Sequence, residues 1–419
     1  MANNRWWSGL SKFQWTILFI AWLGWVFDIM DTALFSFAKV PMMTELLGGP
    51  DAYKVSGPVI EGRIQTIFLI GWAIGGLVFG VLADKYGRTK VLIWTILIYC
   101  LLTGLTAFCQ TWEQVACVRF LTALGIGGEW AAGAALVAEV LPDRSRAAGA
   151  ALLQTAAAVG PSLAALANLG LAGVAWRWLF LVGVAPAIIT VAIRYKISEP
   201  ERQASSEANA PRNGELSEFI SSANLRRNLV VAMVLGIVGV VGAGNVSFWL
   251  PNLVKAVSEG LPEAAIRART SNTTLFLHVG TLAGVLIFPM LCERLGRKWA
   301  FLIGFSASII SVLVCTFYAK TYTQLFLLAP LMALTCIGLT SSFGLYFPEL
   351  FPERLRATGC SLAYNSGRIL AAPFTALTGA MIVGSTVPQG VAAAAVIYVV
   401  GLIALPFGPE TKGKPLPVG

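Results

Sequence analysis

Charged side chains are scarce in this sequence. Only 12% of its 419 residues are Asp, Glu, Lys or Arg, whereas soluble domains carry about 25%. Histidine occurs once, at His278, and the seven cysteines lack the paired spacing that holds a metal ion. The shortage of charge argues against a soluble domain, and the lack of paired His and Cys leads us to expect no metal and no cofactor.

Hydrophobic residues supply 57% of the chain and are gathered into long runs. A helix needs about 20 apolar residues to cross the hydrocarbon core of a bilayer. Twelve runs reach that length, so the sequence predicts an all-α integral membrane protein with twelve transmembrane helices. Residues 40–59, which contain several Gly and Pro, are expected to form an extracytoplasmic loop. The expected spans are 14–39, 60–83, 90–109, 113–138, 147–171, 177–197, 228–256, 268–291, 298–318, 322–347, 357–383 and 388–408.

The second half of the chain repeats motifs of the first half, about 210 residues later. For example, the segment from Glu139 to Gly149 corresponds to the segment from Glu349 to Gly359. Duplicated membrane bundles with a site between them are the architecture of secondary transporters. We therefore expect two pseudo-symmetric six-helix bundles, at 1–197 and 228–419, joined by a cytoplasmic linker at 198–227.

The net charge of +9 is distributed unevenly across the predicted membrane. With both termini in the cytoplasm, 20 of the 30 Lys and Arg fall in cytoplasmic segments. This bias is the positive-inside rule, so the basic charge reflects topology and does not indicate a nucleic-acid partner. We expect a monomeric, multi-pass protein of the inner or plasma membrane, surrounded by the lipid bilayer.

Charged residues also cluster at the predicted cytoplasmic turns, where ion pairs can hold one face of a transporter closed. The segment Gly80-Val-Leu-Ala-Asp84-Lys-Tyr-Gly-Arg88, with a degenerate copy from Met290, resembles the signature loop of the major facilitator superfamily. The resemblance covers nearly the whole chain and implies the major facilitator fold. The residues expected to form a cytoplasmic gate are Gly80, Asp84, Arg88, Glu139, Arg146, Glu293, Arg297, Glu349 and Arg356.

Ionisable groups fall inside the spans of the first half. Asp28 and Asp31 share one helix face, and Arg119 lies at a depth similar to that of Asp31. A charge in hydrocarbon costs at least about 2.5 kcal/mol and usually serves a pathway. Proton binding to either acid would loosen its hold on Arg119 and shift the conformational balance; the alternative is a static buried ion pair. Glu129 is either a second proton site or a packing contact.

The segment from Arg119 to Trp130, together with the two acids of the first span, is similar to carboxylate and aromatic-acid proton symporters of the sugar-porter-like families. In the proton-coupled members of these families, an acid of the first helix and an arginine of the fourth are thought to couple transport to protons. The resemblance therefore implies the proton as coupling ion.

Arg368 lies near the middle of the span 357–383, and its own half has no acid at similar depth. Tyr364 and Asn365 precede it by about one turn and share its face. A guanidinium binds a carboxylate through two parallel hydrogen bonds, so this face suits a carboxylate substrate. Alternatively, Arg368 reaches an acid of the first half.

Three further residues are candidates for the substrate cavity. His278 could titrate near neutral pH or hydrogen-bond substrate, or it could make an ordinary polar contact between helices. Asn245 and Trp249 are four residues apart and could face the same cavity, although Trp249 could also be an interfacial anchor.

The sequence thus predicts a secondary transporter, not an enzyme, that moves a small organic anion together with protons. The anion would be a monocarboxylate or an aromatic or similarly apolar acid. A sugar or polyol porter is less favoured, because a sugar has no charge to meet a fixed cation. A proton-driven drug or metabolite antiporter is the second hypothesis, since Gly160-Pro161 matches part of a motif of that branch. A membrane enzyme or a sensor is the third, but the chain has no nucleophile-elbow serine and no added signalling domain.

Overall fold

The computed structural model describes residues 10–86, 88–142, 145, 149, 152–185, 216–414 and 417. Within these ranges, the side chains outside the description are those at 77, 80, 81, 83–85, 88, 89, 92, 128–140, 216, 217, 353, 354, 356–358 and 361.

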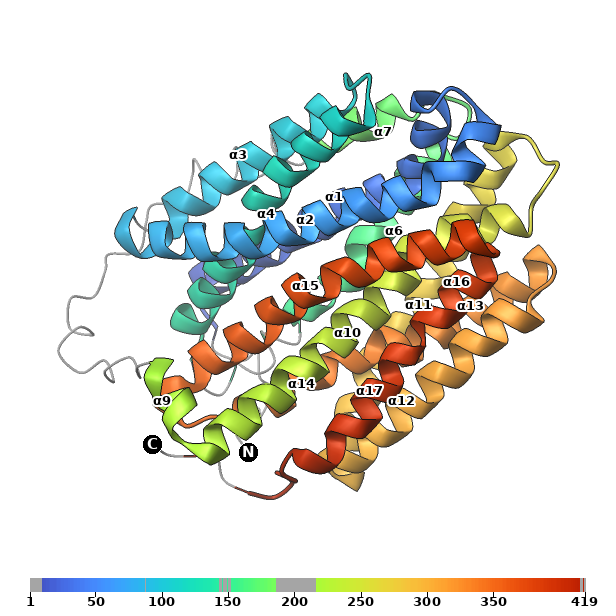
Figure 1. Ribbon diagram of the computed structural model, residues 1–419. Helices are drawn as coiled ribbons and strands as arrows, with labels where there is room; N and C mark the ends of the chain where they lie inside the picture. Colours follow the sequence, from blue (N-terminus) through green and yellow to red (C-terminus); the bar gives the residue numbers. More distant parts are fainter. Residues whose placement is uncertain are drawn as a thin grey trace. The chain divides into compact units, whose positions relative to one another are not determined.

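Every regular element of the described chain is helical (Figure 1). The first part contains α1 (Lys12–Leu46), α2 (Pro50–Tyr86), α3 (Arg88–Thr106), α4 (Trp112–Val140), α6 (Ala156–Gly170) and α7 (Arg177–Val182). The second part contains α9 (Leu216–Ser221), α10 (Ala223–Ala256), α11 (Glu263–Leu295), α12 (Arg297–Leu313), η2 (Val314–Tyr318), α13 (Tyr322–Cys336), η3 (Gly338–Ser342), α14 (Phe343–Glu349), α15 (Glu353–Gly384), α16 (Val387–Ala394), α17 (Val396–Ala404) and η4 (Leu405–Phe407).

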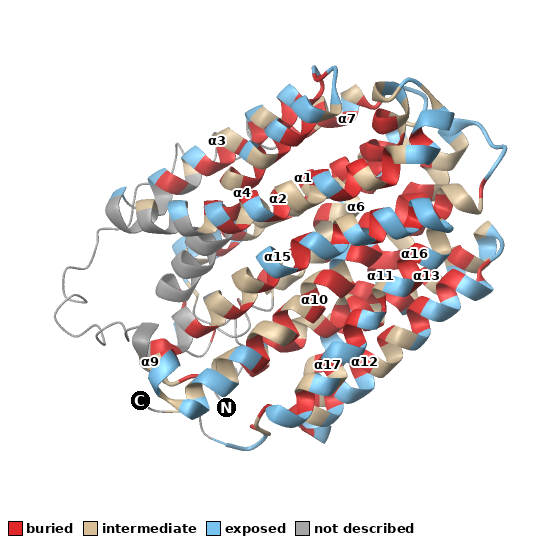
Figure 2. Ribbon diagram, in the orientation of Figure 1, coloured by how far each residue is buried: buried red, intermediate tan, exposed pale blue. Residues whose placement is uncertain are grey.

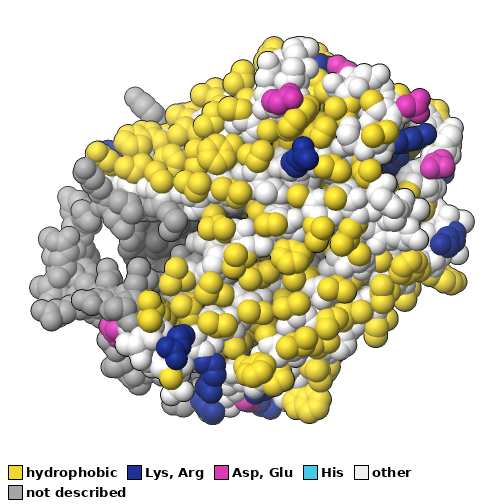
Figure 3. Space-filling view, in the orientation of Figure 1, with side chains coloured by type: hydrophobic (Ala, Val, Ile, Leu, Met, Phe, Trp, Pro, Cys, Tyr) yellow, Lys and Arg dark blue, Asp and Glu magenta, His cyan; other side chains and the backbone are white. Residues whose placement is uncertain are grey.

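Eight helices of the described chain are long and apolar enough to cross a membrane. Hydrophobic side chains are spread over much of the visible surface, and charged ones are sparse (Figure 3). Such a surface suits contact with lipid, since a charged side chain is costly in hydrocarbon.

The prediction of a loop at 40–59 is wrong. Helix α1 continues to Leu46 and α2 begins at Pro50, so only a short turn separates them. Pro41 and Pro58 lie inside the two helices. A proline removes only one backbone hydrogen bond, and neighbouring groups can compensate for that loss in membrane helices.

The contacts divide the chain into two compact units. Unit 1 comprises residues 1–198 and 259–278, and unit 2 comprises residues 199–258 and 279–419. The sequence had placed everything after 228 in the second bundle. The start of α11 joins unit 1 because Arg267 donates to the carbonyl of Val174 at 2.7 Å and Asn168 donates to Ser271 Oγ at 2.9 Å.

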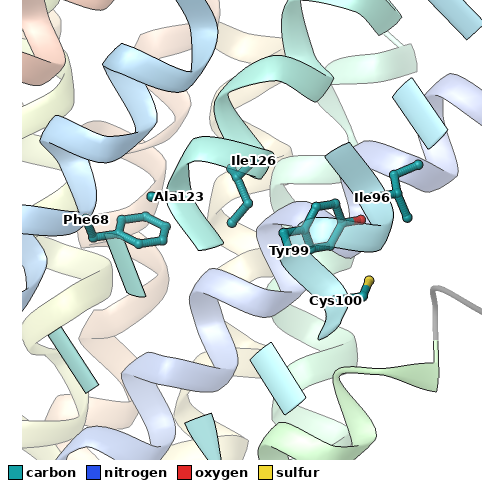
Figure 4. Packing of buried hydrophobic residues seen from close by; sticks show 6 residues of the cluster. All are labelled: Phe68, Ile96, Tyr99, Cys100, Ala123 and Ile126. Carbon is teal, nitrogen blue, oxygen red and sulfur yellow. The ribbon is translucent and has the colours of Figure 1, made fainter. Parts of the chain in front are cut away.

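Glycines let the helices of unit 1 cross backbone to backbone. A Cβ added to Gly75 of α2 would lie 2.1 Å from the carbonyl oxygen of Leu124 in α4. A Cβ added to Gly127 of α4 would lie equally close to the carbonyl oxygen of Trp72. Phe68 of α2 then meets residues of α3 and α4 in a buried cluster with Ile96, Tyr99, Cys100, Ala123 and Ile126 (Figure 4).

We expect Gly75→Ala to destabilise the protein by about 1 to 3 kcal/mol, because the added methyl group forces α2 and α4 apart. Gly244→Ala is the matched control: nothing lies within 4 Å of its added Cβ, and alanine favours a helix by about 0.5 to 1 kcal/mol over glycine. The thermal unfolding midpoint in detergent should fall for the first variant and stay level or rise for the second. Equal midpoints would contradict the proposed close crossing.

Unit 2 uses the same kind of close crossing beside Arg368. A Cβ added to Gly236 of α10 would lie 2.5 Å from the carbonyl oxygen of Ala363 in α15, and one added to Gly367 would lie 2.9 Å from the backbone of Gly236. Elsewhere in unit 2, aromatic rings fill the space between helices: Phe301 stacks on Phe343 with ring centroids 5.4 Å apart. Gly236, Ala363 and Gly367 are all buried at the crossing of α10 and α15, and buried residues recur along both helices (Figure 2).

Candidate substrate and proton sites

A buried ion pair joins α1 to α4 in unit 1. Arg119 Nη1 donates to Asp31 Oδ2 at 2.8 Å, and both residues are buried. The other carboxylate oxygen of Asp31 accepts a hydrogen bond from the hydroxyl of Thr103 on α3. The two residues that the sequence placed at similar depth are thus in direct contact, and Thr103 is a partner that sequence reasoning missed.

Two phenyl rings enclose the remainder of the Arg119 guanidinium. Its central carbon lies 4.6 Å from the ring centroid of Phe35 on α1 and 4.3 Å from that of Phe68 on α2. The Nε and Nη2 atoms have no hydrogen-bond acceptor among the described residues. Among the described residues, the Asp31 carboxylate is therefore the negative charge that accepts a hydrogen bond from Arg119. The two rings add cation–π attraction.

Asp28 lies one turn before Asp31 on α1 and is fully buried. Helix α6 crosses α1 at the same level, because a Cβ added to Gly160 would lie 2.5 Å from the carbonyl oxygen of Val26 and 3.0 Å from the amide nitrogen of Met30. The Gly160-Pro161 pair, which the sequence related to an antiporter motif, thus makes a close helix crossing beside the two acids.

Arg368 of α15 is half-buried in unit 2. Its Nη1 donates to Asn365 Oδ1 at 2.9 Å, and its guanidinium carbon lies 5.7 Å from the ring centroid of Tyr364. The three residues share one face of α15, as their spacing predicts. This face presents a cation, an amide and an aromatic ring, a combination able to bind a planar carboxylic acid.

The other predicted cavity residues are more deeply buried. Trp249 Nε1 donates to Asn245 Oδ1 at 3.1 Å, and Asn245 Nδ2 donates to the carbonyl of Val241 at 2.8 Å, so both bonds remain within α10. His278 is buried in the middle of α11, on the same helix as Thr274 and Thr281. A substrate role for these three residues stays a prediction.

A charged cluster occupies one end of unit 2, among residues predicted for the cytoplasmic gate. Arg297 at the start of α12 makes two hydrogen bonds to Glu349 at the end of α14, at 3.0 Å from Nε to Oε2 and 2.5 Å from Nη2 to Oε1. Thr411 Oγ1 donates to the same carboxylate at 2.5 Å. The fork geometry fixes the two helix ends to each other.

Glu410 is part of this cluster, although it was not among the predicted gate residues. Its carboxylate accepts hydrogen bonds from the backbone amides of Arg297 and Lys298 at 3.0 Å, and also from those of Thr411 and Lys412. It therefore caps the first turn of α12. Gly296 makes room for it: φ there is 97°, and an added Cβ would lie 2.9 Å from Glu410 Oε2.

Burial opposes the charge of Glu410, but the four amide donors outweigh it and hold its pKa below the ordinary value of 4.5. A lowered pKa means that the folded state binds the proton more weakly than the unfolded state does. The cap therefore contributes stability above about pH 4.5 and loses it as the pH falls through the folded-state value.

We expect Glu410→Gln to lower the thermal unfolding midpoint near neutral pH, because the charged cap of α12 is lost. The same variant should lose less stability than the wild type as the pH falls below 4.5, since it has no carboxylate to protonate there. Midpoints measured in detergent across this pH range check both statements. Parallel curves for the two proteins would refute the capping role.

Other predicted gate residues have different outcomes. Glu293 is exposed and forms no ion pair with another described residue, because Arg297 turns to Glu349 instead. Arg146 lies outside the described residues. Gly80, Asp84, Arg88, Glu139 and Arg356 have a helical backbone, but their surroundings lie outside the description. The same holds for the side chain of Glu129, which the sequence offered as a proton site or a packing contact and not as a gate residue.

Comparison with known proteins gives the family. A family model described as Major Facilitator Superfamily matches residues 21–289, and one described as Sugar (and other) transporter matches residues 200–417. The chain belongs to the major facilitator superfamily. It is therefore a multi-pass membrane protein and a secondary transporter, not an enzyme, and its fold class is the predicted twelve-helix one.

Several relatives of this major facilitator protein are named as transporters of organic acids. A protein of Cupriavidus pinatubonensis named as a 4-methylmuconolactone transporter is 30% identical over 97% of this chain and 93% of its own length. The cis,cis-muconate transport protein of Acinetobacter baylyi is 27% identical over 99% of both chains. Among solved structures, a D-xylose-proton symporter matches with a TM-score of 0.76 at 18% identity, covering 96% of this chain and 99% of its own, which supports the fold alone.

Proposed function

We propose that this transporter carries a small organic anion together with protons by alternating access. The anion would be a monocarboxylate or an aromatic or similarly apolar acid. The names of the relatives support the acid class, since muconate is a carboxylate. We further propose that the protein is a monomer of the inner or plasma membrane with both termini in the cytoplasm.

The observation that carries proton coupling is the Asp31–Arg119 pair. An arginine does not deprotonate in a protein, whereas a carboxylate can accept a proton. Protonation of Asp31 removes the counter-charge of a fully buried guanidinium, and breaking a buried pair in this way costs about 3 to 5 kcal/mol. A penalty of that size is large enough to reverse a two-state equilibrium. Proton binding at Asp31, with Asp28 one turn away, would therefore drive a rearrangement of α1 against α4.

The proposed substrate contact is the face of α15 formed by Tyr364, Asn365 and Arg368. Asn365 holds one edge of the Arg368 guanidinium and so fixes its orientation. A carboxylate could then bind through the guanidinium nitrogens while an aromatic or apolar body packs on Tyr364. A neutral sugar would gain nothing from the fixed charge, which favours an acid over a sugar or polyol.

The proposal is tested with purified protein in liposomes, under an inward proton gradient. A panel of aromatic and aliphatic carboxylic acids is compared with neutral sugars and lipophilic cations. We expect accumulation of one or more acids, abolished when the gradient is collapsed with a protonophore. Gradient-driven efflux of lipophilic cations would favour the antiporter instead, and uptake of sugars alone would rule out the anion assignment.

A further inference from the structure

A second buried ion pair lies in unit 1, outside the proposed Asp31–Arg119 coupling pair. Lys39 Nζ of α1 lies 3.2 Å from Glu61 Oε2 of α2, and both side chains are fully buried. The hydroxyl of Tyr53 donates to Glu61 Oε1 at 2.8 Å. Gly57 permits this contact, because an added Cβ there would lie 2.3 Å from the Tyr53 ring. The site is thus built from α1 and from the first turns of α2.

The two ion pairs lie on the same helix faces. Asp31, Phe35 and Lys39 follow each other at steps of four residues along α1, and Glu61, Ile64 and Phe68 follow each other at steps of three and four along α2. Phe35 and Phe68 are the rings that enclose Arg119. One aromatic layer therefore separates the Lys39–Glu61 pair from the Asp31–Arg119 pair. Since α1 and α2 join through the turn after Leu46, Lys39–Glu61 is the pair nearer to that turn.

Stability alone is a weak reason for such a pair. Desolvation of two charges often exceeds their attraction, and apolar replacements of a buried pair are often neutral or stabilising. The cation here is also a lysine, which can lose its proton when buried, unlike an arginine. Both members of the pair can therefore exchange a proton, and a buried ionisable group in a helix of a membrane bundle is by default a functional one.

We propose that Glu61, held by Lys39 and Tyr53, is a second proton-binding site. Its proton enters from the side of the α1–α2 turn. Both Glu61 and Asp31 must be protonated before the carrier with bound substrate turns inward. This inference rests on the proposed proton-coupled transport. The proton binds a Glu61 carboxylate oxygen, and Lys39 stays an ammonium ion without its counter-charge. Tyr53, whose hydroxyl can both donate and accept, lies on the α2 segment that leads to the turn and can pass the proton inward.

Other charges around this site differ in exposure and pairing. Arg119 and Asp31 are paired with each other beyond the aromatic layer. Near the turn, Glu45 of α1 is exposed and pairs with Arg177 of α7 at 2.6 Å. The remaining charged residues of this part of α2 are exposed, namely Asp51, Lys54 and Arg63. Among the described residues of α1 and α2 between the turn and the aromatic layer, Lys39 and Glu61 are the buried ionisable pair.

The first test measures the initial rate of uptake in liposomes against external pH. A rate that needs two bound protons falls about 100-fold per pH unit on the alkaline limb, and one that needs a single proton falls about tenfold. We expect the steeper dependence for the wild type and the shallower one for the double variant Lys39→Met/Glu61→Gln, which leaves no unpaired buried charge. Tyr53→Phe keeps the ring but removes the donor to the carboxylate, so its alkaline limb should move to higher pH.

The second test does not depend on transport. Infrared difference spectra of the substrate-free protein between about pH 5 and about pH 8 should contain a protonated-carboxyl band that the double variant lacks and Asp31→Asn retains. An unchanged slope and an unchanged band in the double variant would show a static pair and overturn this inference. Uptake by the wild type that ignores external pH would instead overturn proton coupling itself.

Discussion

Replacement of Asp31 by Asn is expected to abolish accumulation of substrate under a proton gradient while exchange of substrate across the membrane continues. Asparagine is close to the protonated acid in shape and can still accept a hydrogen bond from Arg119, but it cannot release a proton. The variant should therefore behave as a carrier fixed in the protonated state. The steady-state concentration ratio should fall to about one, and counterflow should stay within about threefold of the wild type.

Asp28→Asn is the matched control for this experiment. Asp28 is equally buried on the same face of α1, but the described hydrogen bond that Arg119 donates is accepted by Asp31. If coupling resides in the Arg119 pair, Asp28→Asn retains part of the accumulation. If both variants still concentrate substrate, neither acid couples transport to protons and the proposed mechanism is wrong.

Removal of the Arg368 guanidinium should weaken binding of the anionic substrate more than any other single change in unit 2. Truncating one partner of a buried, hydrogen-bonded charge pair costs about 2 to 5 kcal/mol, which corresponds to roughly a 30-fold to several-thousand-fold loss of affinity. Binding is followed by ligand-induced thermal stabilisation of Arg368→Ala, using the best acid from the uptake panel.

Two companion variants separate the charge from its geometry. Arg368→Lys keeps a cation but loses the fork, so it should recover only part of the affinity. Asn365→Ala removes the acceptor that orients the guanidinium and leaves the charge in place, so we expect a smaller loss, of about tenfold or less. Undiminished stabilisation of Arg368→Ala by the acid would rule out this face of α15 as the substrate contact.

Local spacing was enough to predict several parts of the candidate sites. The pairing of Asp31 with Arg119 followed from depth along two helices, because rise per residue is nearly constant in a helix. The shared face of Tyr364, Asn365 and Arg368 followed from helical periodicity.

Contacts between distant segments were not predictable in the same way. Neither Lys39 nor Glu61 was a candidate site residue by sequence, because their pairing depends on how far α1 and α2 extend as helices. The partner of Arg297 could have been Glu293 or Glu349 by sequence, and the tertiary arrangement selected Glu349. The helical propensity of a segment does not reveal which carboxylate of a neighbouring helix will lie within hydrogen-bond distance of its basic side chains.

The sequence by itself determined the membrane class, the number of spans, the superfamily and the ionisable residues that are candidates for function. All of these depend on hydrophobicity, helical periodicity and local motifs. Only the tertiary structure decided which of those charges meet. Burial of an ion is tolerated where a partner from another helix lies within hydrogen-bond distance, and that condition is met at Asp31–Arg119, Lys39–Glu61 and Arg297–Glu349. Composition cannot express such a condition, since it concerns the positions of residues far apart in the chain.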